Sequence, residues 1–326
     1  MNPADWRGVD ATRYAAARLR GAIALPVTPF LPDGRVDVAG FRRLVQQILG
    51  YGFRTVAVAA GTGEGDSLTL AERRELCALA ATAACSDDLV MGAIGVGGGD
   101  VSLAELVTEA QVLAEAGVQA LLVFPPGAAA VRPGRMVRLV DEIFQVTGLP
   151  MVIDHGPDPA ALAASMAAAG LPPVVGVKFS SWNDADWDRL LPVIRGQGHM
   201  ISGKGDAVAH RYFARGATSF TSSVVNLAPL VVKELERLLT SGDLGQAERL
   251  TRDLLLPFEQ ARAASAQPPV AVLKGALAVA DLVGGPCRND GQRNLSEEER
   301  DRLVSVVRTL RAAETQLARN AGWVDD

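Results

Sequence analysis

The chain has 326 residues, of which 48% are hydrophobic and 5% aromatic, and it contains 33 glycines. This aliphatic, glycine-rich composition is typical of a large α/β protein with an extensive core and many turns. The formal net charge is −5, with acidic and basic residues interspersed, so no basic stripe is available for nucleic acid, which we exclude as a partner.

The cysteines and the N-terminal segment indicate where the protein works. Cys77, Cys85 and Cys287 are widely spaced and form neither a CxxC pair nor an even disulfide framework, which predicts a reducing cytoplasm. Residues 1–20 are charged throughout, and the first apolar run, 21–27, is too short to cross a bilayer. We therefore expect a cytoplasmic protein without a membrane partner.

Along the chain, strand-like apolar runs alternate with amphipathic segments, which is the pattern of repeated βα units. Amphipathic segments include 41–52, 103–117 and 136–148, each with a glycine at or near its end, as expected at a helix C-terminus. The predicted strands, in chain order, span residues 21–30, 54–61, 89–97, 119–126, 149–156, 173–180, 198–206 and 216–223.

Eight such units within residues 21–240 predict an α/β fold of the (β/α)8 TIM-barrel type. A doubly wound open sheet is the weaker alternative, because no GxGxxG motif follows the first strand. Residues 1–20 are predicted to be an N-terminal helical extension. Residues 241–326 are predicted to form three helices packed on the barrel, the last beginning with Ser296 as N-cap and Glu299 three residues later.

Because TIM-barrel active sites lie at the C-terminal ends of the strands, the side chains found there are the candidate functional residues. A nucleophile, an acid–base group and substrate ligands could all come from this set. In chain order its members are Thr28, Gly61, Thr62, Gly63, Glu64, Asp154, His155, Lys178, Ser202, Lys204, Asp206, Thr221, Ser222 and Ser223.

Lys178 is the candidate nucleophile. It ends the run VVGVK, so its stem lies in an apolar strand end while its amine faces the barrel mouth. Desolvation there lowers the pKa of an ammonium group, and the neutral amine attacks carbonyl carbons. The alternative is a structural lysine that caps the strand or pairs with an acid. Its position at a strand end favours the nucleophile.

Several motifs occur together and in order: LPVTPF with DGRVD, AAGTGEGDSLTLAERREL, VVGVKFSS and GATSFTSSVVNLAP. With them the chain resembles the dihydrodipicolinate synthase and N-acetylneuraminate lyase superfamily of Schiff-base aldolases. The GTGE…SLT form and the C-terminal LKGALAVADLVGGPCR are most similar to its 5-dehydro-4-deoxyglucarate dehydratase branch. The resemblance runs from about residue 21 to residue 312.

The resemblance implies an enzyme without cofactor or metal, in which Lys178 forms an imine with a 2-oxo acid. It also implies that Gly61 and Thr62 hold the substrate carboxylate, and that the protein is a homodimer or homotetramer. A plain tight turn remains the alternative for GTGE. We add Thr28, His155 and Ser222 as candidate substrate contacts, because they are predicted at strand ends, as Lys178 is.

Strand five departs from the pattern of the superfamily. Where the family has a tyrosine that relays protons, followed by an asparagine, this chain has Asp154 and His155. Its three tyrosines, Tyr14, Tyr51 and Tyr212, are not at strand ends, and the aromatic residue that family members lend to a neighbouring site after strand four is missing. The usual proton relay is therefore absent.

Asp154 and His155 are both able to supply acid–base chemistry near neutral pH when partly desolvated. Successive strand residues point to opposite faces, so one of the two should reach the site, and the register with Lys178 favours Asp154. In the alternative interpretation, Asp154 only orients the lysine and His155 packs outward.

Lys204, at the end of strand seven, is the second unusual residue. Near Lys178 it would lower the pKa of the nucleophile by like-charge repulsion, or it would hold a distal carboxylate of an acidic substrate. The alternative is an exposed loop lysine paired with Asp206.

We predict a Schiff-base lyase acting on a small-molecule 2-oxo acid, either a dehydratase of a sugar-derived acid or a retro-aldolase. Its predicted catalytic residues are Lys178, Asp154 and Lys204. The missing tyrosine raises an alternative, a pseudoenzyme that binds an oxo acid without turnover. A metal site is a further alternative, with Asp154, His155, Asp206 and His210 as its candidate ligands. It is less favoured, because these residues form no HxxxH or HExxH motif.

Overall fold

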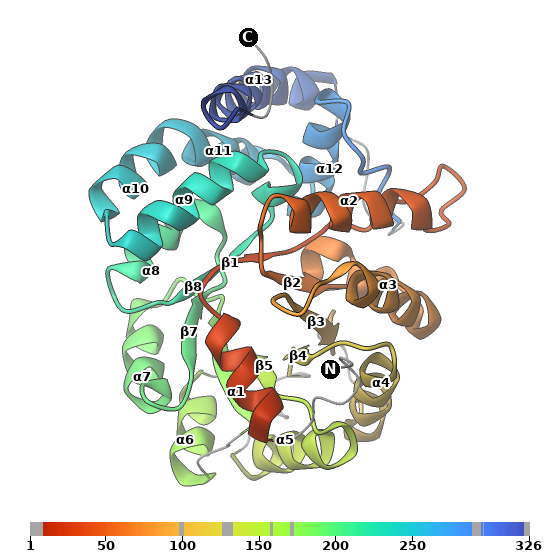
Figure 1. The fold of residues 1–326 in the computed structure, drawn as a ribbon, viewed down its shortest axis with the longest axis vertical. Helices are drawn as coiled ribbons and strands as arrows, with labels where there is room; N and C mark the ends of the chain where they lie inside the picture. The colour runs from red at the N-terminus through yellow and green to blue at the C-terminus, as the bar shows by residue number, and fades with distance from the viewer. Residues whose placement is uncertain are drawn as a thin grey trace.

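The computed structural model describes residues 9–97, 101–125, 133–156, 159–169, 173–288, 295 and 297–322. Eight parallel strands form a closed barrel, in which each strand pairs with its neighbour in the chain and β1 pairs with β8 (Figure 1). The predicted TIM barrel is confirmed. Its strands are β1 (Gly21–Ala24), β2 (Thr55–Val58), β3 (Leu89–Ile94), β4 (Ala120–Val123), β5 (Met151–Asp154), β6 (Val174–Phe179), β7 (His199–Ser202) and β8 (Ser219–Ser222).

Each observed strand lies within its predicted range but is shorter, chiefly at its C-terminal end. β1 ends before Pro26, which has no backbone N–H to donate to a neighbouring strand. β3 ends before Gly95, whose φ of +69° turns the chain out of the sheet. The apolar runs thus continue past the hydrogen-bonded ladder into the loops that form the barrel mouth.

Helices surround the barrel and alternate with its strands. α3 and α4 each begin with a capping box, formed by Thr69 with Glu72 and by Ser102 with Glu105. The helices are α1 (Val9–Arg18), α2 (Val38–Gly50), α3 (Leu70–Ala83), α4 (Leu103–Glu115), α5 (Pro133–Thr147), α6 (Pro159–Ala169), α7 (Asp184–Ile194), α8 (Ala209–Phe213) and α9 (Pro229–Ser241), with short turns η2 (Gly61–Gly63), η3 (Gly65–Ser67), η5 (Asp206–Val208) and η6 (Val224–Asn226).

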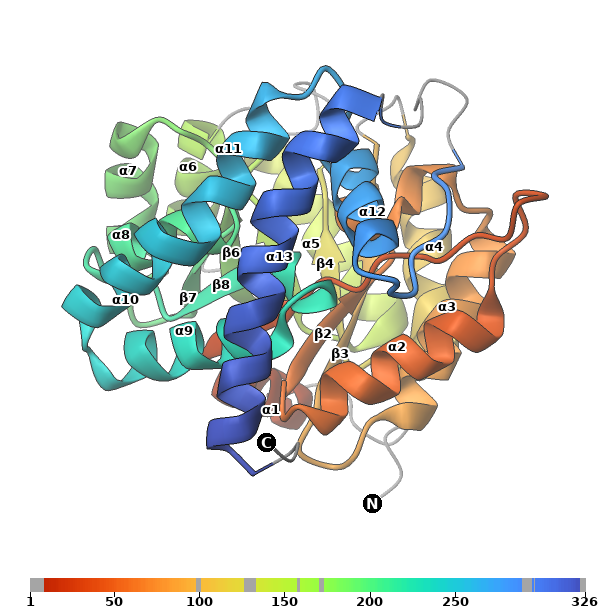
Figure 2. The same ribbon diagram turned by 90° about the horizontal axis from the view of Figure 1, so that it is seen from above.

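The three predicted C-terminal segments are helical. The first is divided by a π-helical turn just before Pro257, because proline cannot donate the hydrogen bond that continues an α-helix. Ser296, the predicted N-cap, lies outside the described residues. Figure 2 shows α13 lying across α9, α11 and α12. The elements are α10 (Leu244–Leu250), η7 (Thr251–Leu255), α11 (Leu256–Ala264), α12 (Pro269–Val279) and α13 (Glu297–Asn320).

One end of the barrel is closed by α1, which crosses it in Figure 1. Ala15 and Leu19 are fully buried and belong to the apolar cluster that fills the barrel interior. The hydroxyl of Tyr14 donates to the carbonyl of Asp88, at the start of β3. Since α1 covers the ends where the strands begin, the open mouth lies where they finish.

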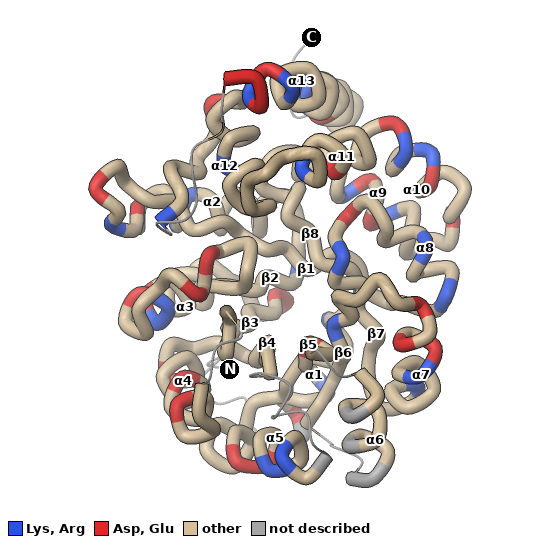
Figure 3. The backbone as a smooth tube through the Cα atoms, turned by 180° about the vertical axis from the view of Figure 1, so that it is seen from behind, with Lys and Arg blue, Asp and Glu red and all other residues tan. Residues whose placement is uncertain are grey.

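Acidic and basic residues are mixed along the described outer helices in the view of Figure 3. In the described part of the chain, no helix has the length and apolarity needed to cross a bilayer.

A buried carboxylate joins α13 to α9. Glu314 is 4% exposed, and its two oxygens accept hydrogen bonds from the backbone N–H groups of Leu230 and Val231, both at 3.0 Å. These amides belong to the first turn of α9 and have no acceptor within that helix. Glu314 therefore satisfies them from a helix about 80 residues away in the chain.

We expect Glu314→Ala to lower the free energy of unfolding by about 1 to 3 kcal/mol, because it leaves two buried amides without a partner. Urea denaturation followed by circular dichroism measures this change. The matched control is Glu298→Ala on the same helix, whose side chain is 83% exposed, and it should change the value by less than about 0.5 kcal/mol. Equal effects of the two substitutions would contradict the capping role.

Candidate active site

Lys178 and Asp154 meet at the mouth of the barrel. They are paired residues of the neighbouring strands β6 and β5, and each is only 8% exposed. Lys178 Nζ lies 2.8 Å from Asp154 Oδ2. Ser180 completes a triangle, with its Oγ 2.7 Å from Nζ and 2.9 Å from Oδ2. A primary amine is thus held directly against a carboxylate and a hydroxyl.

The positive charge of Lys178 determines the protonation state of the Asp154 carboxyl group. Burial alone would raise the pKa of Asp154, but the positive charge and hydrogen bond of Lys178 outweigh it, so the pKa lies below its usual value. Asp154 is therefore ionised at neutral pH and able to accept a proton. The ring of Phe124, 5.2 Å from Nζ, forms an apolar wall beside the amine.

A glycine beyond β7 makes room for this arrangement. A Cβ atom at Gly203 would lie 2.6 Å from Ser180 Oγ and 2.8 Å from Lys178 Cγ. The Gly203 amide also donates to the carbonyl of Phe179 at 2.7 Å, so its backbone stays close to β6. Any side chain at this position would displace the lysine or the serine.

The GTGE segment forms a 3₁₀ turn after β2. Gly63 N–H donates to the carbonyl of Ala60, and the hydroxyl of Thr28 donates to the carbonyl of Gly63 at 2.6 Å. Thr28, predicted to contact substrate, is buried and braces this turn. Gly61 is exposed and Thr62 half-buried, and their amides, as the first of the turn, have no acceptor within it. They remain suited to an anionic ligand.

Lys204 lies at the rim of the mouth. Its Nζ is 4.6 Å from the ring centre of Trp182, a side chain that is 66% exposed. The pKa of Lys204 is lowered, first by partial burial and then by the positive charge of Lys178. The alternative pairing with Asp206 is not found, because Asp206 is fully buried and accepts a hydrogen bond from the Val224 amide.

The structure does not bring His155 or Ser222 to Lys178. The ring of His155 packs at 5.2 Å against Phe179, in the apolar layer between barrel and helices. Ser222 is fully buried, lies beside Asp206 and accepts a hydrogen bond from the Val225 amide. Both side chains follow the strand alternation that points them away from the barrel interior. This corrects their prediction as substrate contacts, and we leave both out of the site.

The three tyrosines lie on or at the end of helices: Tyr14 in α1, Tyr51 at the end of α2 and Tyr212 in α8. Tyr212 packs its ring on Trp187, at 4.7 Å between ring centres. In the described ranges, no group of three or more His, Cys, Asp or Glu side chains is placed to hold a metal ion.

Sequence reasoning missed a role for Ser180. It lies two residues beyond Lys178, and the two-residue period of a strand puts both side chains on one face. That signal was present in the sequence. Sequence reasoning also missed Lys274 of α12, which forms a buried ion pair with Glu64 of the GTGE turn. No local pattern points to this contact, because 210 positions separate the partners.

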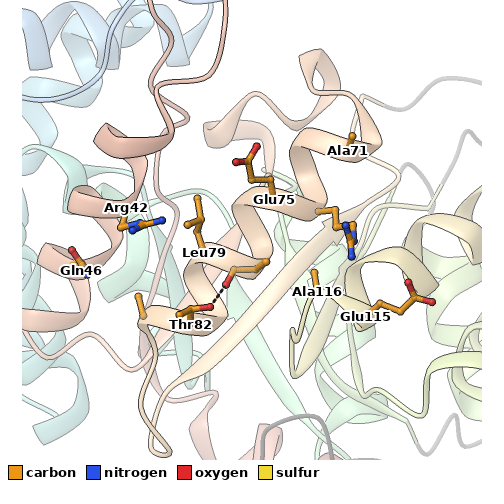
Figure 4. Close-up of a pocket in the computed structure, with 11 residues that line it drawn as sticks. Arg42, Gln46, Ala71, Glu75, Leu79, Thr82, Glu115 and Ala116 are labelled. Atoms are coloured by element: carbon orange, nitrogen blue, oxygen red, sulfur yellow. Dashed lines mark hydrogen bonds between the residues drawn. The ribbon is translucent and has the colours of Figure 1, made fainter.

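A groove on the outside of the barrel lies away from this site. It has a volume of about 640 Å³ and runs between α2, α3 and α4 on the outside of the barrel (Figure 4). Size favours a groove as a binding site, but position and chemistry favour the barrel mouth. The barrel mouth is therefore the candidate site, because this groove is formed by the outer surfaces of helices and contains none of the predicted site residues. Its lining includes Arg42, Gln46, Glu75, Thr82 and Glu115.

The sequence model of the dihydrodipicolinate synthetase family matches residues 18–310. The chain belongs to this family. A relative from Rhizobium rhizogenes, a probable 5-dehydro-4-deoxyglucarate dehydratase, is 27% identical over 301 residues, covering 90% of this chain and 96% of the relative. A 4-hydroxy-tetrahydrodipicolinate synthase from Methylobacterium radiotolerans is 30% identical over 266 residues, covering 79% and 85%.

Two solved structures share the fold of this chain. The dihydrodipicolinate synthase of Bacillus clausii superposes with a TM-score of 0.80 at 22% identity, covering 91% of this chain and 99% of that one. The sialic acid aldolase of Ruminococcus gnavus gives 0.80 at 16% identity, covering 92% and 99%. The family model confirms the family resemblance predicted from the motifs. In this family member, Asp154 on β5 lies beside Lys178 on β6.

Asp206 gives the protein a pH-dependent stability. Burial raises its pKa to about 6, well above the value of about 3.9 in an unfolded chain. Between about pH 4 and pH 6, the Asp206 carboxyl is therefore protonated in the folded state and ionised in the unfolded state. The free energy of unfolding consequently falls as pH rises through this range. The isosteric Asp206→Asn removes this effect.

We expect Asp206→Asn to gain stability relative to the parent as pH rises from 4 to 7, by an amount on the order of 3 kcal/mol. Urea unfolding of both proteins at several pH values measures the difference. Asp253→Asn, an exposed carboxylate in the π-helical turn, is the control and should show no such trend. A difference between Asp206→Asn and parent that stays constant over this pH range would refute the raised pKa.

Proposed function

We propose that the protein is a Schiff-base-forming lyase that acts on a 2-oxo acid through Lys178. The observation that carries the proposal is the buried triangle of Lys178, Asp154 and Ser180 at the barrel mouth. An ion pair by itself also suits a structural lysine. Three features favour a nucleophile: the position at a strand end, the hydroxyl bridging amine and carboxylate, and the membership of a family whose relatives bear lyase and dehydratase names.

The triangle provides for formation of the imine. Asp154 accepts a proton from the ammonium group of Lys178, directly or through the Ser180 hydroxyl, and frees the lone pair on Nζ. Nζ then bonds to C2 of the oxo acid, the C2 carbonyl electrons move to oxygen, and that oxygen takes up the proton that Nζ loses. The Asp154 carboxyl returns its proton to the resulting hydroxyl group, which leaves as water and gives the C2=N⁺ iminium ion, an electron sink for the next step.

Asp154 also suits the step that follows. In a dehydration, the carboxylate takes a proton from the carbon next to the iminium and then gives it to a hydroxyl group, which leaves as water. In a retro-aldol cleavage, it takes the proton of a hydroxyl group as the carbon–carbon bond breaks toward the iminium. In both, one carboxylate beside the imine nitrogen replaces the tyrosine of the superfamily pattern.

Substrate binding would use the turn after β2 and the rim of the mouth. We assign the substrate carboxylate to Gly61 and Thr62, with Thr28 holding the turn from behind. Lys204 on its Trp182 platform is assigned to a second anionic or polar group at the distal end of the substrate. A substrate with a negative charge at each end fits two such anchors.

The names of the relatives favour dehydration of a sugar-derived acid over aldol cleavage, since probable 5-dehydro-4-deoxyglucarate dehydratases align over 90% and 88% of this chain. The alternative of a binder without turnover finds no support among these relatives. A homodimer or homotetramer in the cytoplasm remains part of the proposal.

We expect pyruvate with borohydride to label the protein on Lys178, because reduction makes the imine permanent. Intact and peptide mass spectrometry locate the label. Lys178→Ala should abolish it, whereas Lys233→Ala, at the other end of the barrel, should leave it in place. Label on Lys204 alone, or none with pyruvate and related oxo acids, would end the assignment.

Asp154→Asn should retain the final extent of Lys178 labelling but lower turnover by about 10² to 10⁴-fold, the usual contribution of a positioned proton-transfer group. Ser180→Ala should lower it less, since the direct contact between amine and carboxylate remains. Steady-state rates with 5-dehydro-4-deoxyglucarate and related oxo acids measure this, with Asp253→Asn as control. Turnover of Asp154→Asn at the parent rate would show that another group moves the proton.

A further inference from the structure

Glu64 is a buried charge next to the turn assigned to the substrate carboxylate. It follows Gly63 directly, its side chain is 1% exposed, and its φ of +52° is left-handed, which is uncommon for a residue with a Cβ atom. Its amide donates to the carbonyl of Gly61 at 3.1 Å. The conformation of Glu64 and that of the turn are therefore linked.

Two residues from the C-terminal part of the chain hold the Glu64 carboxylate. Lys274 of α12, 3% exposed, forms an ion pair with Oε1 and also donates to the carbonyl of Pro286 at 2.8 Å. The amide of Arg288 donates to Oε2 at 3.0 Å. Both cationic side chains lie over the ring of Phe30, each 4.4 Å from its centre.

Arg288 extends the same attachment to α3. Its guanidinium contacts both carboxylate oxygens of Glu72 at 2.7 Å, and it donates to the carbonyls of Ser67 and Gly34. The hydrogen bond from Arg288 lowers the pKa of Glu72 to about 2. Arg288, in the segment that follows α12, thus contacts the loop between β2 and α3 at Glu64 and the first turn of α3 at Glu72.

We infer that Lys274 is a positioning residue for the substrate-carboxylate turn and acts through Glu64. The inference rests on the proposed function, in which Gly61 and Thr62 bind that carboxylate. Without Lys274, the buried Glu64 carboxylate loses the cation that pairs with it and has to move toward water. The left-handed backbone at Glu64 loses the contact that holds it, and the amides of Gly61 and Thr62 change direction.

A role in folding alone explains the pair less well. Replacing both members of a buried ion pair by uncharged groups often leaves stability unchanged, so stability does not require the charges. The pair does constrain direction, because a lysine and an amide approach the two oxygens of one carboxylate. Stability and substrate binding can therefore be separated by experiment.

The chain offers a matched control. Lys233 forms an ion pair with Glu236 and lies 5.0 Å from the centre of the Phe53 ring. Lys274 makes the same two kinds of contact, with Glu64 and at 4.4 Å with Phe30. Glu236 bonds to the amide of Ala22, at the start of β1 and far from the barrel mouth. Lys233→Met therefore removes a similar interaction at the opposite end of the barrel.

The experiment titrates pyruvate in the borohydride reaction and measures the half-saturating concentration for label on Lys178. We expect Lys274→Met to raise this concentration by about tenfold or more, with the label still on Lys178 at saturation. Lys233→Met should stay within about twofold of the parent. A half-saturating concentration for Lys274→Met equal to that of the parent overturns the inference.

The double variant Glu64→Gln with Lys274→Met removes both charges and guards against loss of folding in the single variant. Circular dichroism and thermal melting report its stability. We expect a folded protein whose half-saturating concentration remains raised by about fivefold or more. If the double variant is stable and its half-saturating pyruvate concentration equals that of the parent, the ion pair has only a structural role and the inference is overturned. If the parent takes no label on Lys178, the proposed function is overturned as well. If the parent is labelled but the variants have the same half-saturating concentration, the inference alone is overturned.

Discussion

The contact between Lys178 and Asp154 is the interaction on which the rest of the site depends. It takes two opposite charges out of water, and such a pair is favourable only when its remaining hydrogen bonds are satisfied. Ser180 supplies one of them. Because the pairing of β5 with β6 places the two residues side by side, the register of the barrel itself determines the geometry of the proposed nucleophile and its base.

The remainder of the barrel restricts what surrounds this pair. α1 fills the end where the strands begin, so a ligand has access from the opposite end. Gly203 leaves the space that the lysine stem and Ser180 occupy. Phe124 lines the amine with apolar surface, and Lys204 with Trp182 adds a cation at the rim. Under the proposed function, an anionic oxo acid would meet positive charge and hydrogen-bond donors together at the barrel mouth, which suits recognition before chemistry.

The C-terminal helices are more than an outer layer. α13 caps the amides of α9 through Glu314, and the segment from Lys274 to Arg288 reaches the loop after β2 through Glu64 and Glu72. Changes in α12 or in the segment after it therefore act directly on the turn that we propose to bind the substrate carboxylate. This connection links residues that lie more than 200 positions apart, so it forms only when the barrel and its C-terminal helices have packed together.

The sequence by itself determined the (β/α)8 barrel, its family and the position of Lys178, because period-two apolar runs and short motifs are local signals. Strand alternation also favoured Asp154 over His155, and the structure agrees. What the tertiary structure alone decided depends on distance through space: the partner of Lys204, the burial of Ser222 and Asp206, and the ion pair of Lys274 with Glu64. No local pattern encodes these contacts, since each joins side chains whose neighbours are chosen by packing of separate elements.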